Sequence, residues 1–215
     1  MFGKNKANTS ANKQYQNVSV CVPTQGLVHA EFTYCLVNAI KQAESDGIKT
    51  DLVMQEGTVL SNQRQQIAFE ALEKFSPDYL MWLDSDMTFP ADVITRLLDL
   101  NKPVACAAYS KRTPPFIPRV FLDIDPVVPV QITGNLQRVR YAGMGCMLVK
   151  ASVLRSLEMP WFPLTWHRPT SSWHGEDMGF CDLLYKNNIE IWCDTRLSLE
   201  LGHLGTKKYQ LNQEN

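Results

Sequence analysis

The feature that most constrains the fold is an alternation of short apolar runs with longer segments of helical spacing. Val18–Val22 is a short apolar run that stops at Pro23, and Tyr79–Leu83 is a second run, apolar at every position. Glu31–Ser45 and Asn62–Phe75 instead repeat apolar residues every three or four positions. Short continuous runs are typical of strands buried on both faces, and the longer spacing is typical of amphipathic helices. The chain therefore predicts an α/β fold with a parallel sheet and helices on both faces.

The second half of the chain is less regular than the first. The remaining segments with strand or helix patterns are the strands Asp51–Met54, Val104–Ala108 and Ile189–Cys193, the helices Pro90–Leu100 and Glu176–Asn187, and Gly143–Val149, which leads into a short helix ending near Leu157. Val128–Ile132 and Arg138–Ala142 predict a hairpin around Gly134-Asn135. Met159–Trp173, rich in proline and tryptophan, predicts an ordered loop. The expected architecture is a mostly parallel sheet with a small antiparallel extension.

Length and composition indicate one soluble globular domain. The 215 residues suit a single hydrophobic core, which we expect at 17–205, between polar tails at 1–16 and 206–215. The net charge of −1 gives no general attraction to nucleic acid or anionic membranes. We find no membrane-spanning run and no signal peptide. Six cysteines without a C-x-x-C pair favour reduced, buried thiols in a cytoplasmic protein over a zinc site.

Two carboxylates directly follow the run Tyr79–Leu83. Asp84 and Asp86, separated by Ser85, lie where this strand ends, and ligands of open parallel sheets bind at the carboxyl ends of strands. Carboxylate oxygens suit Mg²⁺ or Mn²⁺, and a nucleotide diphosphate can complete the coordination. A turn or helix cap uses the same residue types. The strand context favours metal binding.

Two further segments carry groups suited to catalysis. His203, flanked by Gly202 and Gly205, offers an imidazole that can bind Mn²⁺, although a histidine near a chain end can also have no role. Glu176 and Asp177 open a predicted helix. They either cap its first turn or provide a general base that takes a proton from an acceptor hydroxyl.

Glycine and basic residues at three places have equally open interpretations. Gly145 could let a sugar approach the backbone or could serve close strand packing. Arg64, in the first turn of a predicted helix, could pair with a diphosphate or be an exposed, solvated arginine. Lys111-Arg112 is ambiguous in the same way.

In their order along the chain, these segments resemble the GT-A glycosyltransferases, in particular small phage and bacterial members of the inverting family 2-like group. The resemblance spans about Val18 to Gly205. It rests on the strand into Pro23-Thr24, the helix start Ser61–Arg64, Tyr79–Asp86, Gly143–Val149, and Gly175–Asp177 followed by Ile191–Asp194 and His203–Gly205. The membrane helices and the Q-x-x-R-W motif of processive members are absent from the sequence, which argues against processive polymer synthesis.

The resemblance implies a Rossmann-like GT-A catalytic domain at 17–205. This domain would transfer a hexose or pentose from a UDP- or GDP-sugar to a hydroxyl acceptor, with Mn²⁺ or Mg²⁺ as cofactor. Implied donor contacts are Pro23, Thr24 and Gln25 at the base and ribose, Arg64 near the nucleotide or diphosphate, Asp84 and Ser85 at the end of the strand, and Gly145 beside the sugar. Implied metal ligands are Asp86 and His203, with Asp84 contacting the ribose or a metal-bound water. Asp177, with Glu176 beside it, would be the base, or would orient the acceptor if configuration is retained.

Three tryptophans in the proline-punctuated stretch before Glu176 are candidate acceptor contacts: Trp161, Trp166 and Trp173. Aromatic faces stack on sugars and nucleobases, so an exposed loop would be an acceptor platform. A buried loop would instead be a lid or a satellite core. The acceptor stays open between a glycan, a small molecule and a modified base in phage DNA, and the sequence assigns no oligomeric state.

Two other functions would use similar residues. A nucleotidyltransferase also combines paired carboxylates, a metal and a nucleotide, but it is expected to have a glycine-rich basic loop after the first strand. Pro23–Gly26 lacks that charge. A non-catalytic nucleotide-sugar or carbohydrate-binding domain would not need the full set of metal ligands and base.

Overall fold

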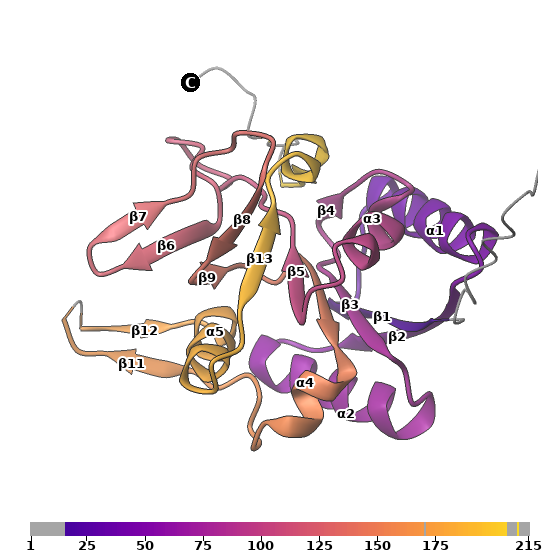
Figure 1. The fold of residues 1–215 in the computed structure, drawn as a ribbon, viewed down its shortest axis with the longest axis horizontal. Helices are drawn as coiled ribbons and strands as arrows, with labels where there is room; N and C mark the ends of the chain where they lie inside the picture. Colours follow the sequence, from indigo (N-terminus) through magenta and orange to yellow (C-terminus); the bar gives the residue numbers. More distant parts are fainter. Residues whose placement is uncertain (1–15, 170, 206–209, 211–215) are drawn as a thin grey trace, which may run out of the picture.

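A seven-stranded sheet forms the centre of the molecule (Figure 1). In the computed structural model, which describes residues 16–169, 171–205 and 210, the strand order is β2 (Lys49–Glu56), β1 (Asn17–Thr24), β3 (Tyr79–Leu83), β10 (Cys146–Lys150), β5 (Val104–Cys106), β13 (Ile191–Asp194) and β8 (Leu136–Val139). Only β10 and β8 run antiparallel to the other five. The predicted mostly parallel α/β sheet is therefore confirmed.

Helices cover both faces of this sheet, as predicted (Figure 1). One face packs against α1 (Ala30–Ser45) and α3 (Val93–Asp99), and the other against α2 (Leu60–Lys74), α4 (Ala151–Ser156) and α5 (Glu176–Lys186). Strand β3 lies between these two layers and is buried at all five positions. Met81 and Leu83 join the core under α1 and α3, whereas Leu80 and Trp82 join the core under α2, α4 and α5. A strand covered on both faces has no position for a polar residue, which explains its apolar sequence.

The predicted hairpin between Val128–Ile132 and Arg138–Ala142 is wrong. Strand β7 (Val127–Pro129) instead pairs with β6 (Val120–Ile124), and β9 (Tyr141–Ala142) pairs with the other edge of β6. A tight turn at Asp125-Pro126 joins β6 to β7, while β8 leaves this group and pairs with β13. The antiparallel extension therefore exists, but its central strand is β6, which follows the prolines at positions 114, 115 and 118 and has no counterpart among the predicted strands.

Several element boundaries also differ from the prediction. Strand β1 continues through Pro23 to Thr24. Its pairing with β3 ends at Cys21, so Pro23 pairs only with β2 and lies at an edge, where a strand tolerates proline. Helix α3 begins at Val93 rather than at Pro90. The expected loop Met159–Trp173 contains most of a hairpin formed by β11 (Thr165–His167) and β12 (Ser172–His174).

Three sequence predictions concern the ends of the chain, the thiols and membrane spans. The predicted polar tails lie outside the described residues, apart from Gln16 and Gln210. All six cysteines are free, and every one except Cys35 is buried, as predicted. Among the residues described, no helix combines the length and apolar content needed to cross a membrane.

The position of helix α5 depends on a close approach at Gly179. This residue is buried, and a Cβ atom there would collide with the backbone carbonyl oxygen of Pro163. Backbone atoms cannot give way as a flexible side chain can, so the helix can lie this close to 163 only with glycine at 179.

We expect Gly179→Ala to destabilise the protein by about 2 kcal/mol or more, since overpacking outweighs the better helix propensity of alanine. For a chain of this size, that corresponds to a melting temperature lowered by roughly 4–8 °C in a thermal unfolding scan. Lys186→Ala, at an exposed position of the same helix, is the control and should change stability by less than about 0.5 kcal/mol. Equal melting temperatures for the two variants would contradict the close-packing role of Gly179.

Candidate functional site

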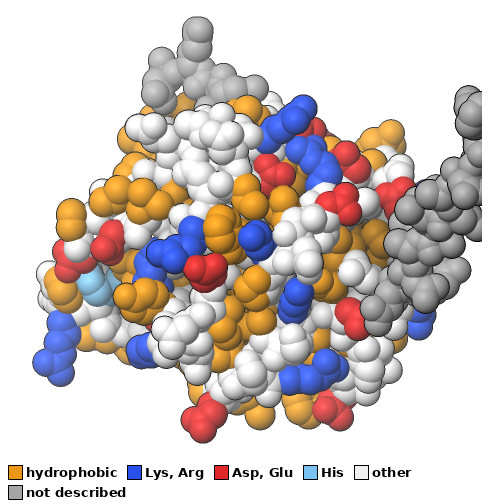
Figure 2. All heavy atoms as spheres, viewed as in Figure 1, with side chains coloured by type: hydrophobic (Ala, Val, Ile, Leu, Met, Phe, Trp, Pro, Cys, Tyr) orange, Lys and Arg blue, Asp and Glu red, His pale blue; other side chains and the backbone are white. Residues whose placement is uncertain are grey.

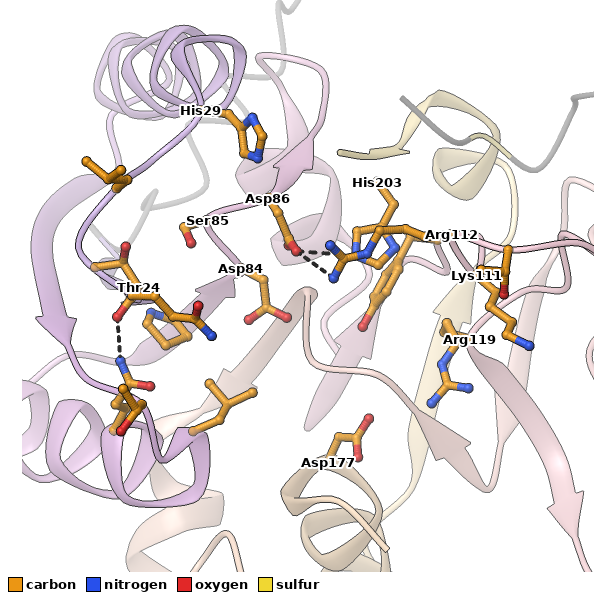
Figure 3. Close-up of a pocket in the computed structure, with 18 residues that line it drawn as sticks. Thr24, His29, Asp84, Ser85, Asp86, Lys111, Arg112, Arg119, Asp177 and His203 are labelled. Carbon is orange, nitrogen blue, oxygen red and sulfur yellow. Dashed lines mark hydrogen bonds and ion pairs between the residues drawn. The ribbon is translucent and has the colours of Figure 1, made fainter. Parts of the chain in front are cut away.

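A pocket of about 630 Å³ opens where β1 and β3 end (Figure 3). Its walls include Pro23, Thr24 and Gln25 after β1, Asp84, Ser85 and Asp86 after β3, Tyr109, Lys111, Arg112 and Arg119 from the segment between β5 and β6, Asp177 of α5, and His203 of β14 (Gly202–His203). This is the edge at which open parallel sheets bind ligands. The structure thus brings ten of the candidate residues into one pocket, from five separate parts of the chain.

The pocket wall at the end of β1 is held by Gln63, whose role the sequence did not reveal. Its side-chain amide donates hydrogen bonds to the carbonyl oxygens of Thr24, at 2.8 Å, and Gln55, at 2.9 Å. The Thr24 hydroxyl accepts a hydrogen bond from the amide of Gly26, at 3.2 Å, and Gly26 has a positive φ of 105°. These bonds fix the loop after β1 against the start of α2. His29, at the start of α1, also lines this side.

Arg64 lies beneath the pocket rather than in it. Its side chain is 1 % exposed, with Nη2 at 2.7 Å from Asp84 Oδ1 and Nε at 3.0 Å from Glu176 Oε1. Burying three charges is costly unless they pair, and here both carboxylates share one guanidinium. Burial raises the pKa of Glu176, and the charge of Arg64 opposes that shift. Arg64 is therefore not an exposed arginine, and its two paired nitrogens bind carboxylates rather than face a diphosphate.

Gly145 makes room for the residues that line the pocket. Its carbonyl oxygen accepts a hydrogen bond from the amide of Asp84, at 3.1 Å. A Cβ atom at Gly145 would lie 2.8 Å from Cε1 of Tyr109 and 3.3 Å from Oδ2 of Asp84. Of the two predicted roles, the structure favours close packing over the approach of a sugar, because Gly145 lies against Tyr109 and is not one of the residues that line the pocket.

Asp86 and His203 lie next to each other in the lining of the pocket. Asp86 Oδ2 lies 3.5 Å from His203 Nε2, and His203 Nδ1 lies 2.9 Å from the carbonyl oxygen of Ser110. A carbonyl can only accept, so Nδ1 carries a proton and Nε2 is the nitrogen that faces the carboxylate. Burial opposes ionisation of Asp86, but hydrogen bonding and charge from His203, together with Arg112, outweigh it and lower the pKa of Asp86.

This pair suits two ligands of one divalent cation. Two atoms that are each about 2.1 Å from a shared cation lie roughly 3–4 Å apart. The Nδ1–carbonyl hydrogen bond is the contact that orients a metal-binding histidine. Among the described residues, no three His, Cys, Asp or Glu side chains form a metal cluster, so Asp84 does not join the other two predicted ligands. Further ligands would have to be oxygens of a substrate or water.

Arg112 already places a positive charge against this pair. Its Nη2 lies 2.9 Å from Asp86 Oδ2, and its side chain is half exposed (Figure 3). An exposed arginine pairs weakly and can move without breaking packed contacts. A cation that binds Asp86 would therefore compete with Arg112, whose side chain is free to turn toward an anion nearby.

The two acidic residues that begin α5 have different environments. Glu176 is 9 % exposed and pairs with Arg64, whereas Asp177 lines the pocket and is only half buried. The Oδ1 atom of Asp177 accepts a hydrogen bond from the Met178 amide, at 2.8 Å. Only Asp177 can therefore reach a bound molecule, and the placement of Glu176 among the catalytic residues is corrected to the Arg64 cluster.

The three predicted acceptor tryptophans also differ in their exposure to solvent. Trp161 is 6 % exposed, and its indole nitrogen donates to the carbonyl oxygen of Leu157, at 3.2 Å, so it is a core residue and not an acceptor platform. Trp166 and Trp173 are 51 % and 66 % exposed and pack edge to face on the β11–β12 hairpin. They lie outside the pocket lining, beside α5.

Comparison with known proteins identifies the fold. No protein family model matches the chain, and no curated protein matches it. Among solved structures, A197 from STIV is similar with a TM-score of 0.60 and 16% identity over 93% of this chain and 95% of that one. GalNAc-T7, solved with UDP, GalNAc and Mn²⁺, is similar with a TM-score of 0.56 and 10% identity over 94% of this chain. The chain has a glycosyltransferase fold.

The match to GalNAc-T7 covers 46% of that protein. This chain thus spans about half the length of that relative, and the part that it shares is the GT-A-like sheet with its helices. At these identities the likeness concerns the fold, and any function has to be argued from the pocket itself.

We expect Arg64→Met to lower the free energy of unfolding by about 3–5 kcal/mol, because it leaves Asp84 and Glu176 without their shared partner. Chemical denaturation followed by circular dichroism measures this loss. The double variant Arg64→Met/Glu176→Gln should recover part of it, since one buried charge is removed. Lys74→Met, which breaks an exposed pair with Glu70, should cost no more than about 0.5 kcal/mol. A similar small loss for Arg64→Met would show that the buried pairs contribute little.

Proposed function

We propose that this chain is a metal-dependent glycosyltransferase that moves a sugar from a nucleotide-diphosphate sugar to a hydroxyl acceptor. The observation that carries the proposal is the convergence of Asp86, His203 and Asp177 on one pocket, with the first two 3.5 Å apart. Such a transfer uses two side chains that bind a metal ion at a strand end and a separate carboxylate in the same pocket. The glycosyltransferase fold supports the same assignment.

The donor would bind along the side of the pocket formed after β1. Pro23, Thr24 and Gln25 offer a surface for the base and ribose, and the Gln63 hydrogen bonds hold that surface in place. The diphosphate would then lie over Ser85, next to Asp86 and His203. Mn²⁺ or Mg²⁺ in this position supplies charge stabilisation for the leaving diphosphate. Asp84, paired with Arg64, positions the loop from which Asp86 projects.

The acceptor hydroxyl would approach from the side of α5. Asp177 lies in the first turn of that helix and lines the pocket. Its role is to take the proton from the hydroxyl as the oxygen attacks the anomeric carbon. The sugar leaves its diphosphate as this bond forms, and the proton ends on the Asp177 carboxylate.

We expect nucleotide binding to depend on the cation through Asp86. Isothermal titration of UDP and of GDP should give at least about tenfold tighter binding for one of them with Mn²⁺ than with EDTA. Asp86→Asn should abolish that difference, because it removes an anionic ligand. Asp99→Asn, an exposed aspartate on α3 outside the pocket lining, should leave it unchanged. Equal nucleotide affinity of the wild-type chain in EDTA and in Mn²⁺ would contradict the metal-dependent mechanism.

We expect Asp177→Asn to separate binding from turnover. The variant should keep the metal-dependent nucleotide affinity within about twofold, while sugar transfer, or donor hydrolysis in its place, falls by roughly 10²–10⁴. The measurement is release of nucleoside diphosphate from the nucleotide-sugar that the wild-type chain uses. Asp99→Asn again serves as the matched control. Unchanged turnover by Asp177→Asn would exclude it as the base, and binding without any wild-type turnover would favour a non-catalytic domain.

A further inference from the structure

The wall of the pocket opposite Thr24 is basic (Figure 3). Lys111, Arg112 and Arg119 all line it, although Lys111 and Arg119 are eight positions apart in the sequence. The chain folds back on itself here. The amide of Lys111 donates to the carbonyl oxygen of Ile117, at 2.9 Å, and the amide of Arg119 donates to that of Tyr109, at 2.8 Å. This antiparallel contact places the two cations on the same wall.

Only one of these three cations has a carboxylate partner. Arg112 pairs with Asp86, whereas no ion pair is formed by Lys111 or Arg119 within the part of the chain that the structure describes. Arg119 is half buried, and its guanidinium lies 5.7 Å from the Phe121 ring centroid. A partly buried guanidinium and an unpaired lysine that line the same pocket provide positive charge suited to an anionic ligand.

The donor and its metal do not account for this charge. Figure 3 shows Asp86 between Thr24 on one side and Arg119 and Lys111 on the other. The two negative charges of a sugar diphosphate are balanced by one divalent cation. Arg112 is the basic residue next to that position, and it already has Asp86 as a partner. Lys111 and Arg119 therefore remain for a second anion, and Figure 3 shows Asp177 below the pocket centre, between Asp84 and Arg119.

We propose that the acceptor is a compact molecule that carries a phosphate group, bound by Lys111 and Arg119 while its hydroxyl faces Asp177. This inference rests on the proposed glycosyltransferase function. Phosphate fits an arginine fork combined with the point charge of a lysine, and its double charge matches two cations.

A compact acceptor fits the pocket better than a nucleic acid does. The volume of about 630 Å³ is shared with the donor. On the face shown in Figure 2, basic side chains are interspersed with acidic and apolar ones and form no continuous stripe. The net charge of −1 agrees with this distribution. Backbone binding of nucleic acid needs a basic surface that extends beyond one pocket.

The test uses the full chain with Mg²⁺, titrated with glycerol 3-phosphate at constant ionic strength, with and without UDP or GDP. We expect saturable binding of glycerol 3-phosphate and none of glycerol. The double variant Lys111→Gln/Arg119→Gln should weaken it about tenfold or more and keep nucleotide affinity within about twofold. Arg138→Gln, an exposed arginine that pairs with Glu190 outside this pocket, is the matched control.

Four outcomes would overturn the proposal. Glycerol 3-phosphate could bind wild type and double variant equally, or bind neither. The double variant could lose nucleotide affinity instead, which would assign both cations to the donor. Single-stranded DNA of twenty thymidine nucleotides could bind over a hundredfold more tightly than glycerol 3-phosphate, which would indicate a nucleic-acid acceptor. Failure of the wild-type chain to bind any nucleotide would count against the glycosyltransferase function itself. The titration without nucleotide would still measure whether glycerol 3-phosphate binds at Lys111 and Arg119.

Discussion

One buried guanidinium connects the two halves of the candidate site. Arg64 pairs with Asp84, two positions before Asp86, and with Glu176, the neighbour of Asp177. Asp84, just after β3, and Glu176, at the start of α5, are 92 positions apart in the sequence, and this side chain bridges them beneath the pocket floor. The proposed metal ligand and the proposed base are therefore placed by the same ion-pair cluster. Because removing one partner from such a cluster is costly, their relative position is held firmly.

Around this cluster, the pocket has three regions with different chemistry. Gln63 holds a polar surface at the end of β1, the centre carries Asp86 and His203, and the far wall carries Lys111 and Arg119. The centre also depends on a glycine, because Tyr109, whose ring packs against His203 at 5.0 Å, occupies the space that a side chain at 145 would take. This arrangement fits the proposed group transfer, in which one substrate would lie on each side of Asp86 and His203.

Local patterns predicted the parts of this site that depend on local structure. The apolar sequence of Tyr79–Leu83 identified β3 with its correct ends, and with it the position of Asp84 and Asp86 at a strand terminus. The start of α5 was also found, since acidic residues favour a first helical turn. The sheet class followed from the alternation of strands and helices. Each of these features is set by residues within about fifteen positions of one another.

Features that depend on distant partners were beyond such patterns. The burial of Arg64 is explained by Glu176, 112 positions away, and no local signal distinguishes it from an exposed arginine. The sequence left Trp161 open between an acceptor contact and a buried residue, because its partners are distant: its amide donates to the side chain of Gln65, 96 positions away. Strand β6 was missed because prolines precede it, and the hairpin prediction then paired its neighbours wrongly. Arg119 joins Lys111 only through that same folded segment.

In the proposed mechanism, Asp86 and His203 bind one divalent ion that holds a diphosphate. Anomalous scattering from a crystal grown with Mn²⁺ and UDP or GDP measures this directly. We expect a peak within about 2.3 Å of both Asp86 Oδ2 and His203 Nε2, with diphosphate oxygens completing the coordination and Arg112 displaced from Asp86. A nucleotide bound in the pocket with no peak between these two side chains, and with Arg112 still paired to Asp86, would contradict it.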